Sequence, residues 1–238
     1  LKPTSVETVV VYASALHKNS LEMISPVSVL SGDELRNKSK PTLGETLKGL
    51  PGVNASYFGP VSSSPIIRGL DGPRVKITQN GLDASDASRI GPDHATSSDS
   101  LAAEQIEMCK DTDVITIGVV NVVDNRIPTD NIDELTGAAE YSHDTVSNSN
   151  TVAAKLETGN EGFNFHFDGT KRSGDDYQTP TFTIADDDGD VETENSVENT
   201  FIDSETLNFG TSYVGDHLTI GFSYGSIDTD YGIPGHEH

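Results

Sequence analysis

Tryptophan is absent from the 238-residue sequence, cysteine occurs once (Cys109), and aromatic residues make up only 6%. A single cysteine excludes an internal disulfide and a zinc site built from cysteines. No apolar run approaches the roughly 20 residues of a membrane-spanning helix. No secretory signal pattern follows Leu1, so we expect any export signal to have been removed or left out. Glycine is abundant instead, with 22 residues, which favours a β-rich protein over a helical one.

Basic residues are scarce in the second half of the chain. Residues 1–129 hold 15 acidic and 12 basic side chains, whereas residues 130–238 hold 23 acidic side chains and only three basic ones. The three are Lys155, Lys171 and Arg172. Such a surface repels nucleic acid and anionic membrane surfaces, because both require cationic contacts. The charge shift marks a boundary near residue 129, where the stretch NRIPTDN supplies turn residues.

The first half has the pattern of a small α+β domain. Ser31 with Glu34, and Thr42 with Glu45, have the spacing of helix capping boxes. A third helix is predicted over Ser98–Met108 from the spacing of its apolar side chains. The predicted strands are Thr8–Ser14, Val27–Leu30, a strand from Pro65 that precedes a turn at Gly69–Pro73, Arg74–Thr78 and the run IGVVNVVDNR from Ile117, with a second turn at Asn80-Gly81.

The second half alternates apolar and polar residues with a period of two, which is typical of strands with two different faces. Phe163, Phe165 and Phe167, for example, alternate with Asn164, His166 and Asp168. Five strands are predicted, around Leu135–Tyr141, Val152–Glu157, Phe163–Asp168, Leu207–Tyr213 and from Leu218 onward, and the last is expected to lead into a loop, IDTDYGIPGHEH, that begins at Ile227. Short connections (TGNEG, VGDH) alternate with longer ones (SHDTVSNSN and about thirty residues after Arg172), a pattern shared by outer-membrane barrels and soluble sandwiches.

The order of motifs resembles that of a TonB-dependent outer-membrane receptor, with a plug domain first and a barrel after it. Glu7–Val11 (ETVVV) resembles the energy-coupling TonB box of such receptors. The segments PVSVLSGDEL, TLGETLKGLPGV, IIRGLDGPRVKITQNGL and DSLAAEQIE resemble successive plug segments, and GVVNVVDNRIP resembles the exit from plug to barrel. The motif GPDHA (Gly91–Ala95) and the terminal His-Glu-His are most similar to the zinc-uptake subgroup.

The resemblance implies an α+β plug domain followed by an antiparallel β meander, a partial outer-membrane β-barrel of about five strands. The implied domains are residues 1–15 with the TonB box, a plug over 16–129, and the first part of the barrel over 130–238. Five strands cannot close a barrel that has about 22 strands in this family, so the chain is expected to be a fragment.

One segment departs from the family pattern. After QIE the family continues with an Arg-Gly-Pro turn and a glycine-rich stretch, whereas this chain has MCKDTDVITIG, residues 108–118. We therefore expect residues 108–114 to be irregular and the chain to rejoin the sheet between Ile115 and Val123.

The implied function is energy-coupled transport in the outer membrane of a Gram-negative bacterium, without catalysis by the chain. The implied partners are a TonB-type inner-membrane protein, which would bind Glu7–Val11 by strand addition, and outer-membrane lipid. The free strand is equally compatible with a first plug strand. No cofactor is expected to bind tightly, and no nucleic acid is expected as a partner.

The predicted cargo is a metal ion, with zinc as the hypothesis and an iron chelate or haem as the alternative. Imidazole and carboxylate ligands suit zinc. Asp93 and His94 are the candidate ligands of a transit site, and the tail His236, Glu237 and His238 is expected to face water and feed it. The simpler readings are a hydrogen-bonded loop histidine for His94 and a solvated end for the tail.

The other alternative is a secreted β-rich adhesin or cation-binding module, with Phe163, Phe165, Phe167, Leu207, Phe209, Ile220 and Phe222 packed together in a closed soluble sheet. Catalytic motifs are absent. His236–His238 lacks the spacing of a zinc protease helix, and no phosphate-binding loop or nucleophile elbow occurs. Asp186, Asp188 and Asp190 imitate a calcium loop that lacks its final glutamate.

Overall fold

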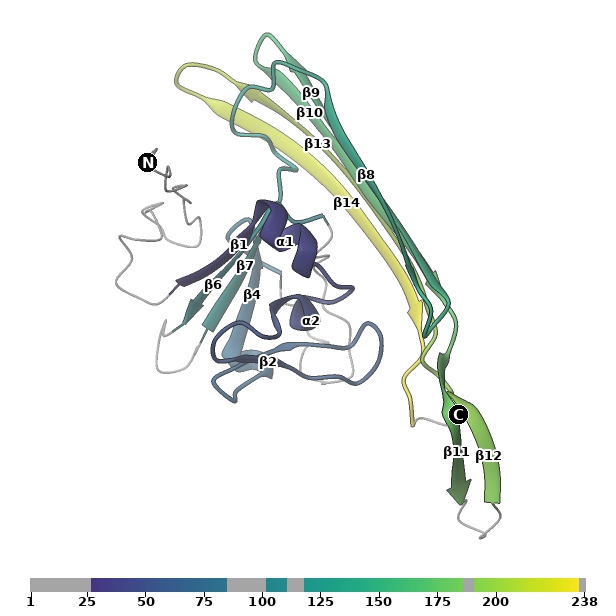
Figure 1. The fold of residues 1–238 in the computed structure, drawn as a ribbon. Helices are drawn as coiled ribbons and strands as arrows, with labels where there is room; N and C mark the ends of the chain where they lie inside the picture. Colours follow the sequence, from purple (N-terminus) through teal and green to yellow (C-terminus); the bar gives the residue numbers. More distant parts are fainter. Residues whose placement is uncertain (1–26, 85–101, 111–117, 186–190, 236–238) are drawn as a thin grey trace, which may run out of the picture. The chain divides into compact units, whose positions relative to one another are not determined.

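The computed structural model describes residues 27–84, 102–110, 118–185 and 191–235 (Figure 1). The chain divides into two compact units. The first unit extends to Tyr57 and continues from Ser62 to Asp124, and the second comprises Phe58–Val61 and the chain from Asn125 onward. The predicted strand Thr8–Ser14 and the acidic run at residues 186–190 lie outside the described residues.

A five-stranded sheet forms the centre of the first unit, in the order β1-β6-β7-β4-β5. β4 and β7 are parallel, whereas the other neighbours are antiparallel. A separate hairpin pairs β2 with β3. The elements are β1 (Val27–Ser31), α1 (Gly32–Lys38), α2 (Leu43–Leu47), β2 (Val53–Ala55), β3 (Pro65–Ile67), the 3₁₀ turn η2 (Gly72–Arg74), β4 (Val75–Gln79), β5 (Leu82–Asp83), β6 (Gln105–Lys110) and β7 (Gly118–Val123).

The two capping boxes behave differently. Before α2, the side chain of Thr42 accepts a hydrogen bond from the backbone N–H of Glu45 at 3.3 Å, which confirms that cap. Before α1, Ser31 has the extended backbone of an N-cap, but its side chain caps no N–H. The first box is therefore wrong as a hydrogen-bonding motif, although the helix begins where it predicted.

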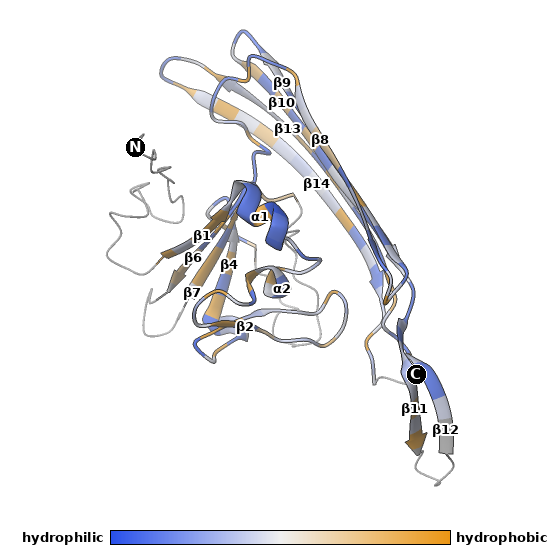
Figure 2. Cartoon of the chain, in the orientation of Figure 1, coloured by the Kyte–Doolittle hydropathy of each residue, from blue (hydrophilic) through white to orange (hydrophobic). Residues whose placement is uncertain are grey.

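One apolar core holds the first unit together. It joins both helices to one face of the strands, and Figure 2 shows β7 largely in hydrophobic colours. Cys109 is buried on β6, and this burial, with the Glu107 carboxylate nearby, raises the pKa of its thiol. The core consists of Leu30, Leu35, Leu43, Leu47, Val53, Ile67, Val75, Ile77, Ile106, Met108, Val120 and Val122.

The predicted helix over Ser98–Met108 is wrong at its end, where β6 is a strand that pairs with β1 and β7. Ile106 and Met108 alternate with polar neighbours and are both fully buried, so a period of two governs the segment. The expected irregular stretch also begins too early, because β6 continues as a regular strand to Lys110. Residues 111–117 lie outside the described part, and β7 resumes the sheet at Gly118.

The second unit is an antiparallel sheet of five long strands in the order β14-β13-β10-β9-β8, which confirms the predicted meander. A two-residue turn, Glu161-Gly162, joins β9 to β10, with both residues at positive φ. The strands are β8 (Thr136–Asp144), β9 (Ser149–Asn160), β10 (Phe163–Gly174), β13 (Ile202–Val214) and β14 (Thr219–Tyr231).

Two connections differ from the prediction. The link between β8 and β9 is a four-residue turn, residues 145–148, because the strands run further than the apolar alternation indicated. The long link between β10 and β13 contains a hairpin of β11 (Tyr177–Ala185) and β12 (Val191–Val197). Its base is fixed by Asp176, whose carboxylate accepts from the backbone N–H of Thr200 at 2.7 Å.

The last strand is also longer than expected. Residues 227–231 were predicted as part of a loop, but they extend β14 and pair with β13 as far as Ile202. The hydroxyl groups of Ser204 and Thr229 lie 2.9 Å apart across these strands, so the acidic stretch IDTDY belongs to the sheet.

Candidate functional site

The residues predicted to bind partner or metal all lie outside the described part of the chain. They are Glu7, Thr8, Val9, Val10 and Val11 of the proposed TonB box, Asp93 and His94 of the proposed transit site, and His236, Glu237 and His238 of the tail. Their roles remain predictions, and the structural account of the site rests on the two faces of the β8–β14 sheet and on the polar interior of the first unit.

One face of the long sheet is apolar over its middle and exposed. Phe167 on β10 pairs laterally with Leu156 on β9 and with Phe209 on β13, and Phe209 pairs with Tyr224 on β14. Phe163 and Tyr213 close one end of this band, with ring centroids 5.0 Å apart. From Phe163 to Gly169 the band spans about 20 Å along the strand. This length approaches the roughly 25 Å apolar belt of a membrane barrel.

The exposure of this band excludes the closed sandwich of the adhesin alternative. The seven side chains that such a sandwich would pack together are each 42–62% exposed and lie on one face of an open sheet. The structure places them on β10, β13 and β14, where only Phe167 and Phe209 lie directly opposite one another. The packed soluble core proposed for residues 130–238 is therefore wrong.

The opposite face is polar and carries a buried cluster of charged side chains. His166 is 1% exposed, and its Nδ1 lies 2.9 Å from Glu157 Oε1. Its Nε2 lies 2.7 Å from Asp168 Oδ2. Lys155 approaches Glu157 at 3.3 Å, and Asn208 Nδ2 donates to Asp168 at 2.7 Å. We call Lys155, Glu157, His166 and Asp168 the inner charge cluster.

The inner charge cluster is electrically neutral only with a protonated histidine. A neutral imidazole has one N–H, whereas both ring nitrogens of His166 face a carboxylate oxygen. The imidazolium donates to both, and two carboxylates are then balanced by His166 and Lys155. A buried charge is tolerated when it is paired and hydrogen-bonded, as here.

A second polar group occupies the interior of the first unit, around Asn121 of β7. The Asn121 side-chain oxygen accepts from Thr78 Oγ1 at 2.8 Å and from the Gly81 N–H at 2.9 Å. Its amide nitrogen donates to Glu107 at 3.0 Å, and Gln105 donates to the other Glu107 oxygen at 2.7 Å. These bonds join β4, β6 and β7 across the sheet and fix the Asn80-Gly81 turn.

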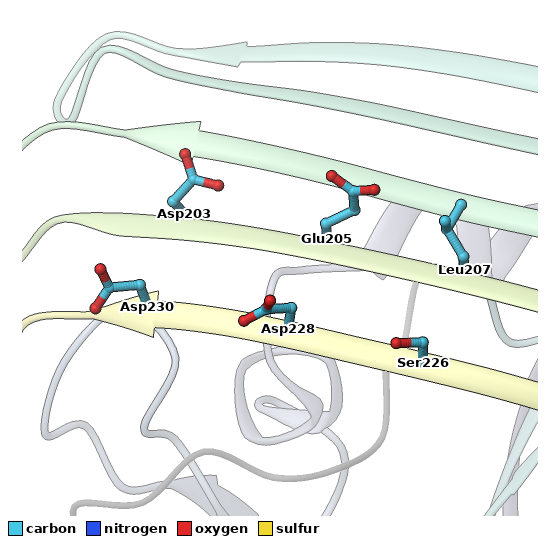
Figure 3. A pocket seen from close by; sticks show the side chains of 6 residues that line it. All are labelled: Asp203, Glu205, Leu207, Ser226, Asp228 and Asp230. Atoms are coloured by element: carbon cyan, nitrogen blue, oxygen red, sulfur yellow. The ribbon is translucent and has the colours of Figure 1, made fainter.

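Carboxylates line a shallow groove at one end of the apolar face. Figure 3 shows Asp203, Glu205 and Leu207 on β13 beside Ser226, Asp228 and Asp230 on β14, projecting from the same side. Glu205 has a basic neighbour in Lys171, 3.5 Å away on β10. The apolar band is therefore followed along β13 and β14 by acidic residues, and the end of β14 has the blue colour of hydrophilic residues in Figure 2.

Metal-binding geometry is absent from the part of the chain that the structure describes. Within those residues, no three histidine, cysteine, aspartate or glutamate side chains converge as a metal site would require. This holds for the acidic groove and for the inner charge cluster as well. Among the described residues, no helix is long and apolar enough to cross a membrane.

The plug region also matches a known family. Residues 19–122 match the model described as the TonB-dependent Receptor Plug Domain. The first unit is therefore similar to a TonB-dependent receptor plug domain. This family comprises transporters and receptors rather than enzymes, and its members reside in the outer membrane of Gram-negative bacteria, which is the location of this chain. The described fold is a plug domain with an open, partial barrel sheet.

Solved structures share this fold at low sequence identity. The copper transporter OprC is 17% identical with a TM-score of 0.66, covering 88% of this chain and 31% of OprC. The siderophore receptor PirA from Acinetobacter baumannii is 14% identical with a TM-score of 0.67, covering 89% and 32%. The FrpB iron transporter from Neisseria meningitidis is 12% identical with a TM-score of 0.59, covering 84% and 31%. The chain spans about a third of the length of these structures.

The inner charge cluster is the functional feature that sequence reasoning missed. The alternation placed Glu157 and His166 on polar faces, but it did not pair them. The signal was the two-residue Glu161-Gly162 turn, because such a turn fixes the register of the two strands it joins. Counting outward from that turn places His166 opposite Glu157, as the structure does.

Proposed function

We propose that this chain is the N-terminal third of an outer-membrane receptor that takes up a metal, free or chelated, by TonB-dependent transport. The observation that supports this best is the sequence of the two units: a plug domain is followed by a sheet that is apolar on one face and polar on the other. That is the face pattern of a barrel in lipid around an aqueous or plugged lumen.

The transport cycle follows from this arrangement without chemistry by the chain. A ligand binds from outside, and an inner-membrane partner of the TonB type adds a strand to Glu7–Val11 and pulls. Main-chain hydrogen bonds supply the affinity of strand addition, so the segment must be extended and able to offer its N–H groups. The plug then rearranges and the ligand passes.

The proposed cargo is a metal, and a free ion and a metal chelate are both compatible with the chain. The similar structures are titled as copper, iron and siderophore proteins. An iron chelate therefore fits as well as a free ion. Zinc remains a hypothesis that depends on the GPDHA motif, with Asp93 and His94 in a transit site and His236–His238 as the capturing tail.

Energy coupling is tested in the full receptor with Val9→Pro. Proline removes a backbone N–H and cannot join a central ladder, so uptake should fall to background while ligand still binds to cells. Val9→Thr is the matched control, because threonine keeps the N–H and the β-branched shape, and it should transport normally. Full uptake by the proline variant, or by a deletion of Glu7–Val11, would contradict the proposal.

The cargo is tested by calorimetric titration of the full receptor with zinc, with copper and with a ferric siderophore. If zinc is the ligand, Asp93→Ala/His94→Ala should lower zinc affinity at least tenfold and leave the other two titrations unchanged. Wild-type zinc affinity should also fall at pH 5, where free imidazoles are mostly protonated. Equal zinc affinity in the double variant would remove these residues from the site.

A further inference from the structure

A segment of the second unit lies along the polar face of its own sheet. We call residues 125–132, from Asn125 to Ile132, the strap. At one end Asn125 Nδ2 donates to Glu157 Oε1 at 2.7 Å. At the other end the Ile132 N–H donates to Asn164 Oδ1 at 2.7 Å. Between them, Ser212 Oγ donates to the carbonyl oxygen of Pro128. The strap is thus held by side chains of β9, β10 and β13.

The residues of the sheet that the strap contacts most closely are glycines. A Cβ atom on Gly210 of β13 would overlap the carbonyl oxygen of Arg126. A Cβ on Gly221 of β14 would overlap Cγ2 of Ile127, and one on Gly159 of β9 would lie 2.5 Å from the carbonyl oxygen of Ile132. All three glycines have ordinary negative φ, so the turn geometry does not require them. Their lack of a side chain serves the close approach of another backbone.

The inner charge cluster contacts the Asn125 end of the strap. Glu157 Oε1 accepts from both Asn125 and His166, and its other oxygen faces Lys155. The carboxylate that binds the strap is therefore itself held by two further side chains, His166 and Lys155. Four strands, β9, β10, β13 and β14, contribute to one binding surface, which combines glycines that contact the strap with hydrogen-bonding groups at both ends.

We propose that this surface is a built-in binding site for the strap, and that the strap stays bound as part of the barrel wall while residues before Asn125 rearrange. The first half of the proposal concerns the fold alone, and the second half rests on the proposed transport function. In this account Asp124-Asn125 is the pivot of plug movement, and Gly159, Gly210 and Gly221 are the residues that make strap binding possible.

The binding site is tested by hydrogen exchange on the full receptor, followed in the peptide that spans residues 125–132. Gly210→Val should accelerate exchange of that peptide at least tenfold, because its side chain occupies the place of the strap backbone. Thr211→Val, the adjacent residue on the apolar face, should leave it unchanged. Ser212→Ala is the milder second variant and should accelerate exchange several-fold. Unchanged strap exchange in both Gly210→Val and Ser212→Ala would overturn the binding site.

The persistence of the bound strap is tested with a disulfide between Ile127→Cys and Gly221→Cys, in a Cys109→Ala background. The oxidised receptor should take up ligand as fast as the reduced one. Uptake that is lost on oxidation and restored by reductant would overturn this part, because the strap would then have to leave the wall. Absence of uptake in the wild-type receptor would instead contradict the proposed function, and the exchange experiment would still decide the binding site.

Discussion

The plug buries its apolar side chains, whereas the barrel sheet exposes its apolar side chains and buries polar ones. Among the described residues of the plug, twelve apolar side chains form a core in which Leu43, Leu47 and Ile67 are fully buried. In the sheet, the large aromatic side chains are exposed, whereas the buried side chains include the polar residues His166, Asn164 and Asp168. The difference shows that the same period of two can describe a strand that faces a protein core and a strand that faces lipid.

The two regions differ in what covers their apolar surface. Strands β4, β6 and β7 are covered by helices and loops of the plug, and their polar side chains are hydrogen-bonded to each other around Asn121. The sheet from β8 to β14 leaves its apolar face to the hydrocarbon of the membrane. Deleting apolar side chains should therefore have unequal effects in the two regions.

The largest effect is expected for Leu47→Ala in the plug. This side chain is fully buried, so its removal leaves a cavity and should lower the free energy of unfolding by about 2–5 kcal/mol. Leu156→Ala makes the same chemical change on the apolar face of β9, where detergent or lipid fills the space, and should change stability by less than about 1 kcal/mol. Denaturant titration of the receptor in detergent compares them. Equal losses would remove the distinction between the regions.

A charge placed in the apolar band should have the next largest effect. Phe167→Arg lies in the middle of the band and should destabilise the folded sheet in lipid by about 2–4 kcal/mol. Ser173→Arg lies on the same face of β10 beyond the band, beside Asp203 of β13, and should cost about 0–1 kcal/mol. Folding titrations in lipid vesicles measure both. A tolerated arginine at position 167 would mean that this face does not contact lipid.

The smallest effect is expected at the two predicted helix caps. Thr42→Ala removes the bond to the Glu45 N–H and should destabilise the plug by about 1 kcal/mol, whereas Thr42→Ser should restore most of it. Ser31→Ala should change stability by less than about 0.5 kcal/mol, because the Ser31 side chain makes no capping bond. Thermal denaturation of the three variants decides whether the two capping boxes differ as the structure indicates.

The five long strands were predictable because their alternation is local and a lipid-facing sheet needs no distant partner to define its apolar face. The end of the predicted Ser98–Met108 helix failed for the opposite reason. Leu101, Gln105 and Met108 have helical spacing, but β6 lies between β1 and β7, and this pairing decided its conformation. Both faces of β6 are buried at Ile106 and Glu107, and the apolar alternation extends over only Ile106 and Met108, too short a run to outweigh the helical spacing.

The polar face of the sheet was predictable only in part. Sequence alternation assigned Asn164, His166 and Asp168 to one face, and the structure confirms it. The strap was interpreted as a turn-rich boundary, because nothing in NRIPTDN indicates what its backbone will contact. The glycines that receive it, such as Gly210, resemble any other strand glycine until the fold brings the two segments together.

The most direct test of the account measures which face of β14 contacts lipid. The 238 residues include no tryptophan, so a single one introduced at either face can be read in the full receptor once any tryptophan outside these residues has been replaced by phenylalanine. Tyr224→Trp lies in the apolar band, whereas Ile227→Trp lies three residues further on the polar face, opposite Thr206. In vesicles of brominated lipid, fluorescence of the tryptophan at position 224 should be strongly quenched and that at position 227 should not. Equal quenching at both positions, or quenching at 227 alone, would contradict the assignment of this sheet to a membrane barrel wall.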